Sequence, residues 1–328
     1  MEERPSVHME RTCKIIRRSI YTFLKNYQYF TTTAAVIVFP ASASILLSQS
    51  LGPLLLPLFS IIQVRLQSLF CASGFPPSSK FISLLNLKLS QTLCSSILSI
   101  PFTLSFLLLA KACVIDALQP YFSSFLSLYV PLLITHLCNS FIILSANAVT
   151  FSLLFLVFSI LDVFGFSSPN ILLVVLVAAA IFYSVILANS LVVCNLSLVV
   201  AGMENCSGFL AILKACMLIR GRASTALSLA LPVNLGLAFV EALFQYRIVR
   251  VYNHSDRLSH SILLEGMFIA YLYSLFILLD TIANCMLFKS FKSSSHMDPE
   301  CRYFYPEEIL GDEDCSTITY SKNLLELP

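Results

Sequence analysis

The chain has 328 residues, of which 57% are hydrophobic and only 12% are charged, and its formal net charge is +2. A soluble globular domain carries about twice that share of charged residues. Together with a mean hydropathy of +0.84, this composition excludes a soluble enzyme domain, a nucleic-acid-binding protein and a disordered protein. It predicts an all-α fold, a polytopic membrane helical bundle.

The N-terminal segment is basic and precedes the first apolar stretch. Residues 1–29 contain six Lys and Arg residues, a longer basic region than a secretory signal has, so residues 30–50 are predicted to form the first transmembrane helix. The next segment, 51–70, is apolar but is broken by Pro53, Pro57 and Arg65. Its apolar runs are too short to cross a hydrocarbon core of about 30 Å, and we interpret it as an amphipathic helix at the interface.

The second and third spans are predicted from a long stretch with few charges. The second covers residues 89–110, which Lys88 and Lys111 flank as interfacial anchors. No Asp, Glu, Lys or Arg occurs between Gln119 and Leu161, and a helix of that length would be about twice as long as the membrane is thick. We therefore predict a third span at 141–164. A segment at 121–138, bent at Pro131, would precede it and lie partly at the interface, although it could also form a separate span.

Three further spans are predicted at 171–200, 224–244 and 262–288. Six spans place both termini on one side, where the connections carry 14 Lys and Arg residues against 6 on the other side. The positive-inside rule therefore predicts that both termini are cytosolic. Residues 293–328 hold eight acidic and two basic residues. We interpret this acidic tail as disordered and as a contact for cytosolic proteins.

The connection between the fourth and fifth spans has the clearest character. It reads "GMENCSGFLAILKACMLIRGRASTALSLALP", and apolar residues recur in it with helical spacing before a basic cluster. This pattern predicts a second amphipathic helix at the membrane interface. Lys214, Arg220 and Arg222 are candidate lipid contacts, because an anionic cytosolic leaflet attracts cations. The alternative is that these three residues only set the topology.

Polar side chains inside the predicted spans form a second kind of candidate site, because they are costly in a membrane. One interpretation is an ion-pair cluster of the two glutamates with Arg247 and Arg250, together with interhelical hydrogen bonds made by the amides. The alternative is a polar substrate cavity or a cation path. The candidate intramembrane residues are His136, Asn139, Asn147, Glu241, Glu265 and Asp280.

Motifs for catalysis are missing from the sequence. It contains no Gly-rich phosphate loop, no G-x-S-x-G and no H-E-x-x-H, so we expect no enzymatic activity, no cofactor, no metal, and neither nucleotide nor nucleic acid as a ligand. The expected function is that of a multi-pass membrane protein that organises or contacts lipids or partner proteins. The alternative is a small-solute transporter or channel. Pro40, Pro101 and Pro232 favour it, because discontinuous helices can line binding sites.

Two resemblances follow from these segments. The connector, with its Lys-containing A-x-x-x-A stretch and "LIRGR", resembles that of bacterial six-span YciC-like proteins and the membrane domain associated with glycerophosphodiester phosphodiesterases. The chain to about residue 292, with "FLKNYQYF", "SILLSQSL" and "GFPPSS", more closely resembles an uncharacterised plant family of six-span transmembrane proteins. These resemblances imply the six-span fold and no activity. The phosphodiesterase activity belongs to an attached catalytic domain, whose metal-binding acids and His pairs are missing from this chain.

Overall fold

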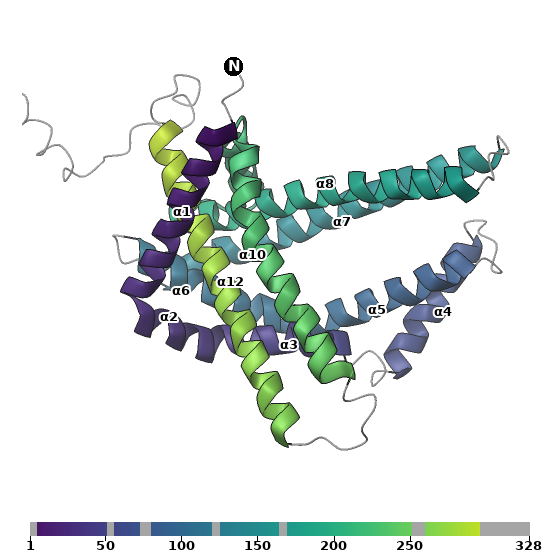
Figure 1. Cartoon of the computed structure of the whole chain (residues 1–328), viewed down its shortest axis with the longest axis horizontal. Helices are drawn as coiled ribbons and strands as arrows, with labels where there is room; N and C mark the ends of the chain where they lie inside the picture. Colours follow the sequence, from purple (N-terminus) through teal and green to yellow (C-terminus); the bar gives the residue numbers. More distant parts are fainter. Residues whose placement is uncertain are drawn as a thin grey trace, which may run out of the picture. The chain divides into compact units, whose positions relative to one another are not determined.

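The computed structural model describes residues 5–50, 56–72, 80–119, 125–163, 169–250 and 260–295. Within these ranges nearly every residue is helical and no strand occurs, which confirms the predicted all-α fold (Figure 1). One compact unit comprises Met1–Phe288. The second unit, Lys289–Pro328, is described only as far as Ser295, where the last helix ends. Most of the predicted acidic tail therefore lies outside the described residues.

Six stretches are long and apolar enough to cross a membrane, as the sequence predicts. About 20 apolar residues in a helix suffice for this. We number these stretches as spans one to six. They are Tyr27–Ser48, Leu89–Leu118, Leu128–Thr150, Val177–Glu204, Ala223–Val249 and His260–Ser293.

The helices follow one another with short π-helical segments inside three of the spans. They are α1 (Pro5–Lys25), α2 (Tyr27–Thr33), η1 (Ala34–Val38), α3 (Phe39–Ser50), α4 (Leu56–Ala72), α5 (Lys80–Phe102), η2 (Thr103–Leu107), α6 (Leu108–Leu118), α7 (Phe125–Val163), α8 (Pro169–Glu204), α9 (Phe209–Ile219), α10 (Ala223–Phe244), η3 (Gln245–Val249) and α12 (His260–Ser295). The first π segment has a local cause. It contains Val36, whose carbonyl the Pro40 ring would meet in a regular α-helix.

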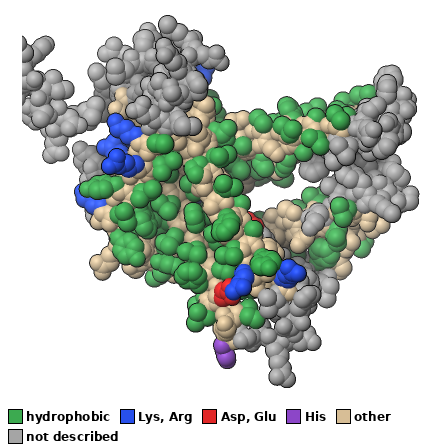
Figure 2. All heavy atoms as spheres, in the orientation of Figure 1, with side chains coloured by type: hydrophobic (Ala, Val, Ile, Leu, Met, Phe, Trp, Pro, Cys, Tyr) green, Lys and Arg blue, Asp and Glu red, His purple; other side chains and the backbone are tan. Residues whose placement is uncertain are grey.

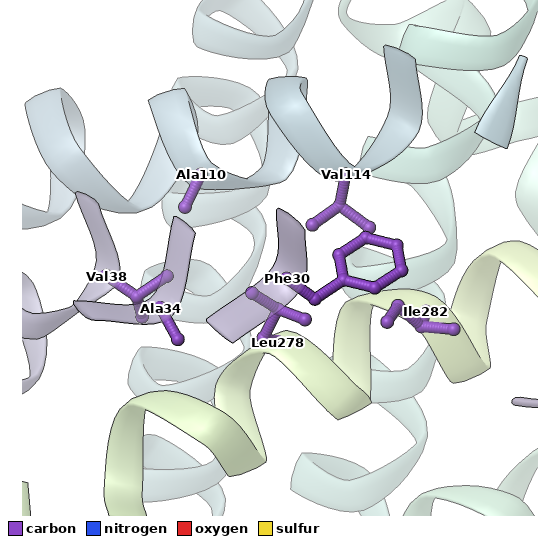
Figure 3. Packing of buried hydrophobic residues seen from close by; sticks show 7 residues of the cluster. All are labelled: Phe30, Ala34, Val38, Ala110, Val114, Leu278 and Ile282. Carbon is purple, nitrogen blue, oxygen red and sulfur yellow. The ribbon is translucent and has the colours of Figure 1, made fainter. Parts of the chain in front are cut away.

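Span one is the element that joins spans two, five and six. Phe30, Ala34 and Val38 recur at four-residue spacing, so they share one face of span one. In the first cluster they pack against Ala110, Val114, Leu278 and Ile282 of spans two and six (Figure 3). The second cluster joins span one to spans five and six through Leu46, Val240, Phe244, Ile269, Ala270 and Tyr273. Between the clusters, the Ser42 hydroxyl donates to the Ala270 carbonyl at 3.0 Å.

The outward faces of the spans are apolar as well. Ile181, Phe239 and Leu264 have exposed fractions of 61%, 69% and 72%. Figure 2 shows apolar side chains over much of one face, with few charged ones among them. A surface of this kind is unfavourable in water, but lipid tails are as apolar as leucine. The described helices therefore have the surface of a membrane protein.

The second span is longer than predicted. It does not end at residue 110 but continues through α6 to Leu118. Lys111 therefore lies inside the candidate span and not directly after its end, and its role as an interfacial anchor stays a prediction. Ala110 and Ala112, on either side of it, are buried within the protein. The helix can continue past the charge because this part of it faces other helices.

The segment at 121–138 does not form a separate element in the described part of the chain. A single helix, α7, runs from Phe125 to Val163 with Pro131 inside it. The candidate span within α7 is Leu128–Thr150, and residues 141–163 of the predicted third span lie in the same helix. Leu128 and Leu132 are buried. Tertiary packing, which local sequence reasoning did not include, thus holds this segment in the helix.

The helix predicted at 51–70 is α4, which is described from Leu56. It packs on α5, and its partly buried face repeats at helical spacing through Phe59, Ile62 and Leu66. Its opposite face is exposed and apolar, with Ile61 and Val64 at 60% and 64%. The location of α4 at the membrane interface stays a prediction.

Candidate functional site

The connector between spans four and five is tied to the bundle by two backbone turns. The left-handed conformation of Asn205, with φ at 50°, ends α8, and Asn tolerates this region better than most residues do. Gly208 precedes α9 with φ at 65° and ψ at −132°. Its N–H donates a hydrogen bond of 2.9 Å to the Thr135 hydroxyl of α7. The start of α9 is therefore attached to α7.

An ion pair forms the second attachment. The Lys214 ammonium of α9 lies 3.0 Å from Oε2 of Glu204, the last residue of α8. Their side chains are only 18% and 8% exposed. The Lys214 charge is thus paired with Glu204 within the protein, and a contact of Lys214 with lipid stays a prediction. Sequence reasoning missed the pair because the turn between α8 and α9 is what brings residues 204 and 214 together.

The two faces of α9 are both apolar. Ala211, Ile212, Ala215, Leu218 and Ile219 are buried, and α9 packs on α8 and α7. On the other face, Phe209, Leu210 and Leu213 are 73%, 51% and 52% exposed. The outer face of α9 is therefore apolar. We call Phe209, Leu210 and Leu213 the α9 apolar face.

Arg220 and Arg222 follow α9 in different surroundings. Arg220 is exposed, and its backbone N–H donates to the carbonyls of Cys216 and Met217, which ends the helix. The next residue, Gly221, has φ at 77°, and Arg222 is half-buried directly before α10. The structure thus places one exposed cation, Arg220, at the end of the helix that carries the α9 apolar face.

Two thiols beside this surface are protonated at neutral pH. Burial raises the pKa of the Cys206 thiol, between α8 and α9, above its ordinary value. Partial burial also raises the pKa of Cys216 on α9. Because the thiolate is the reactive form, neither thiol is activated for nucleophilic attack.

Interhelical hydrogen bonds account for two of the predicted intramembrane amides. The Asn139 amide of α7 donates to the Cys194 carbonyl of α8 at 2.9 Å, and its oxygen accepts from the Ser197 hydroxyl at 3.0 Å. Further along α7, the Asn147 oxygen accepts from the Tyr183 hydroxyl of α8 at 3.1 Å. These bonds agree with the interpretation that the amides join helices.

Replacing Asn139 with leucine is expected to lower the free energy of unfolding by about 1 kcal/mol, because it removes two bonds between α7 and α8. The Ser197 hydroxyl keeps its 2.8 Å bond to the Cys194 carbonyl, so the loss stays moderate. The shift of the unfolding midpoint in denaturing detergent would measure it. Ser140→Ala, at an exposed position of α7, is the control. Equal midpoints for the two variants would contradict the role of Asn139.

The predicted ion-pair cluster at the ends of spans five and six is present in part. The Arg247 Nε atom lies 2.6 Å from Oε1 of Glu265, and the side chains are 54% and 35% exposed. The Arg250 guanidinium lies 5.5 Å from the centre of the Tyr246 ring. Glu241 is half-buried in span five. An exposed pair of this kind contributes little in water, so the Arg247–Glu265 pair fixes geometry more than it stabilises the fold.

Lys111 links two of the predicted polar residues. It is half-buried in α6 and interacts electrostatically with Asp280 of α12 and with His136 of α7. The Asn284 amide, one turn after Asp280, donates to the Asp280 carbonyl at 2.8 Å. The residues predicted to line one polar cavity therefore lie in two separate groups. His136 and Asp280 share Lys111, whereas Asn139 and Asn147 bond to α8.

No group of three or more His, Cys, Asp and Glu side chains that could hold a metal ion occurs among the described residues. Six apolar candidate spans, an apolar outer surface and polar side chains paired between helices together define an all-α membrane protein. The chain belongs to the family described as Domain of unknown function (DUF8558), which matches residues 3–300. Comparison with curated proteins and with solved structures gave no match.

Proposed function

We propose that this protein is a non-enzymatic, multi-pass membrane protein that organises or contacts lipids or partner proteins, and that α9 is its contact element. The observation that carries the proposal is the α9 apolar face, exposed on a helix that Gly208 and Lys214 attach to α7 and α8. A helix held in this way presents Phe209, Leu210 and Leu213 in a fixed arrangement. Such a face buries itself at the boundary of headgroups and acyl chains.

Membrane lipids are the proposed ligands, and no cofactor, metal, nucleotide or nucleic acid is required. Arg220 is the proposed partner for lipid phosphate, since it is exposed beside the end of α9. The acidic tail would contact cytosolic proteins, and its eight acidic residues support this. We also propose that the chain is related to the uncharacterised plant family and to the YciC-like proteins that its sequence resembles.

Both termini are proposed to be cytosolic. Of the 14 Lys and Arg residues that the sequence assigns to their side, Lys111 lies inside span two, and the other 13 still outnumber the 6 on the opposite side. In sealed vesicles with the outer membrane face outward, added protease should leave a C-terminal tag intact. Permeabilised vesicles provide the control, in which the tag should be cleaved. Cleavage of the tag in sealed vesicles would reverse the topology.

Purification of the full chain within patches of its own membrane tests the proposed function. Lipids and proteins that co-purify with it should differ from the bulk membrane. Phe209→Ala with Leu213→Ala should lose this enrichment. The matched control is Leu235→Ala with Phe239→Ala, which truncates two similarly exposed side chains of α10 and should retain it. Bulk composition for the unmodified chain, or equal loss in both variants, would overturn the proposal.

A second candidate function is small-solute transport. The observation that favours it is Lys111, placed inside span two and near enough to Asp280 of span six to interact with it electrostatically. Ionisable groups inside a membrane often mark a solute or proton path. Flux into proteoliposomes that contain the unmodified chain, abolished by Asp280→Asn, would replace the lipid-contact proposal with this one.

A further inference from the structure

The N-terminal helix α1 has an exposed face that neither the bundle nor the α9 site uses. Thr12, Ile15 and Ser19 are buried at 5%, 8% and 2%, and they recur at helical spacing. This face packs on α10, where the Thr12 hydroxyl lies 3.0 Å from the Ser228 hydroxyl. The helix is therefore docked on span five and is not a free basic arm.

The opposite face of α1 combines positive charge with apolar surface. Lys14, Arg18, Tyr21 and Lys25 form one stripe at spacings of four, three and four residues, and all four are exposed. A neighbouring stripe repeats this spacing. It consists of Cys13, Arg17, Ile20 and Leu24, all exposed. Figure 2 shows Lys and Arg side chains gathered over α1.

The position of α1 places this face at a membrane boundary. Lys25 is two residues before Tyr27, where span one begins, and Ser228 lies five residues after Ala223, where span five begins. In a six-span chain, spans one and five begin on the same side. Thr12 lies near the beginning of span five, and Tyr27 begins span one, so both are close to that boundary. They are fifteen residues apart, about 22 Å along a helix. The helix therefore runs along the boundary.

The composition of the face matches one kind of partner. The two stripes contain four cations and no acidic residue, interleaved with Ile20, Tyr21 and Leu24, which are 47%, 66% and 60% exposed. Water would disfavour the apolar groups, and the acyl interior would disfavour the cations. The headgroup zone of an anionic leaflet accommodates both, with cations at the phosphates and apolar groups deeper.

We infer that the exposed face of α1, formed by Lys14, Arg18, Tyr21 and Lys25 with the adjacent stripe, binds anionic phospholipid headgroups. The inference rests on the proposed lipid-contact function and gives it a lipid class and a second surface. The face recruits acidic lipids around the beginning of spans one and five. The acidic tail of the same chain is the competing occupant.

The chain contains no tryptophan, so Tyr21→Trp places a single fluorescent reporter in the stripe. We propose to reconstitute the full chain with this substitution in bilayers that contain brominated phosphatidylserine or, at the same mole fraction, brominated phosphatidylcholine. The fluorescence of the indole at position 21 should be quenched more strongly by the anionic lipid. Lys14→Gln with Arg18→Gln should reduce the preference for the anionic lipid about twenty-five-fold, since each cation near an anionic leaflet contributes about fivefold. Arg65→Gln with Arg250→Gln removes two exposed cations elsewhere and should leave the preference within about twofold.

Equal quenching by the two lipids, or a preference that Lys14→Gln with Arg18→Gln leaves unchanged, would overturn the inference. A preference for the anionic lipid that is seen only after truncation of the chain at Ser295 would also overturn it. That result would mean that the acidic tail occupies the face in the full chain. A Phe209→Trp reporter distinguishes this outcome from failure of the proposed function. If both lipids quench the indole at position 209, the lipid contact of α9 stands and only the assignment to α1 is lost.

Discussion

Replacing Lys214 with methionine is expected to lower the free energy of unfolding by about 3–5 kcal/mol, the cost of removing one partner from a buried ion pair. The Glu204 carboxylate is 8% exposed and lies 3.0 Å from the Lys214 ammonium. Without that ammonium, the carboxylate keeps the cost of burial and loses a close opposite charge. Unfolding of the full chain in denaturing detergent would measure the loss, together with weaker attachment of α9.

The double variant Lys214→Met with Glu204→Gln should recover most of this loss, since it removes the buried charge along with its partner. Arg220→Gln serves as the matched single substitution, because it removes an exposed cation just after the same helix and should change stability by less than about 0.5 kcal/mol. Equal stabilities for Lys214→Met and Arg220→Gln would contradict a structural role for the ion pair.

Replacing Gly208 with alanine is expected to cost about 2–3 kcal/mol. Its φ of 65° and ψ of −132° lie in a region that is essentially restricted to glycine. A Cβ atom there would also lie 3.4 Å from Cγ2 of Ile134. Relief of this strain would weaken the bond from the Gly208 N–H to Thr135. A lower unfolding midpoint, with faster proteolysis at the turn between α8 and α9, would measure the effect.

Gly221→Ala is the matched control for this prediction. Gly221 also has a positive φ, 77°, but a Cβ atom there would have no neighbour within 4 Å. The expected cost is therefore smaller, about 1 kcal/mol. A larger effect at Gly221 than at Gly208 would show that the first turn of α9 is not the constrained one.

Hydropathy was sufficient to predict the fold class and the presence of six spans, because their apolar runs are long and nearly free of charge. It failed at the ends of those runs. The second span was predicted to end before Lys111 since a charge normally ends a span, whereas the candidate span continues past Lys111 and its buried neighbours to Leu118. Likewise, 121–138 was predicted to be a separate segment that is bent at Pro131 and precedes the third span, whereas Phe125–Val163 is one helix with Pro131 inside it. Both differences concern tertiary contacts that no local pattern contains.

The candidate site was only partly predictable for the same reason. The connector helix was predicted from its apolar spacing, but its orientation depends on Glu204 and Thr135, which come from α8 and α7. Of the predicted cations, Lys214 is paired and Arg220 is exposed. The helix α1 was not predicted, although bases at positions 14, 18 and 25 repeat at helical spacing. That repeat could have predicted the helix. Counting the basic residues without their spacing did not reveal it.

The most direct test of the account is whether the α9 apolar face lies in lipid. In the full chain, which has no tryptophan of its own, Phe209→Trp reports the environment of a side chain that is 73% exposed. A Phe141→Trp reporter on α7, at a position 71% exposed, provides the reference for a transmembrane helix. Brominated lipid should quench both reporters to a comparable degree. Emission typical of an indole in water at position 209, with no quenching by brominated lipid, would contradict the proposal that α9 is a lipid-contact element.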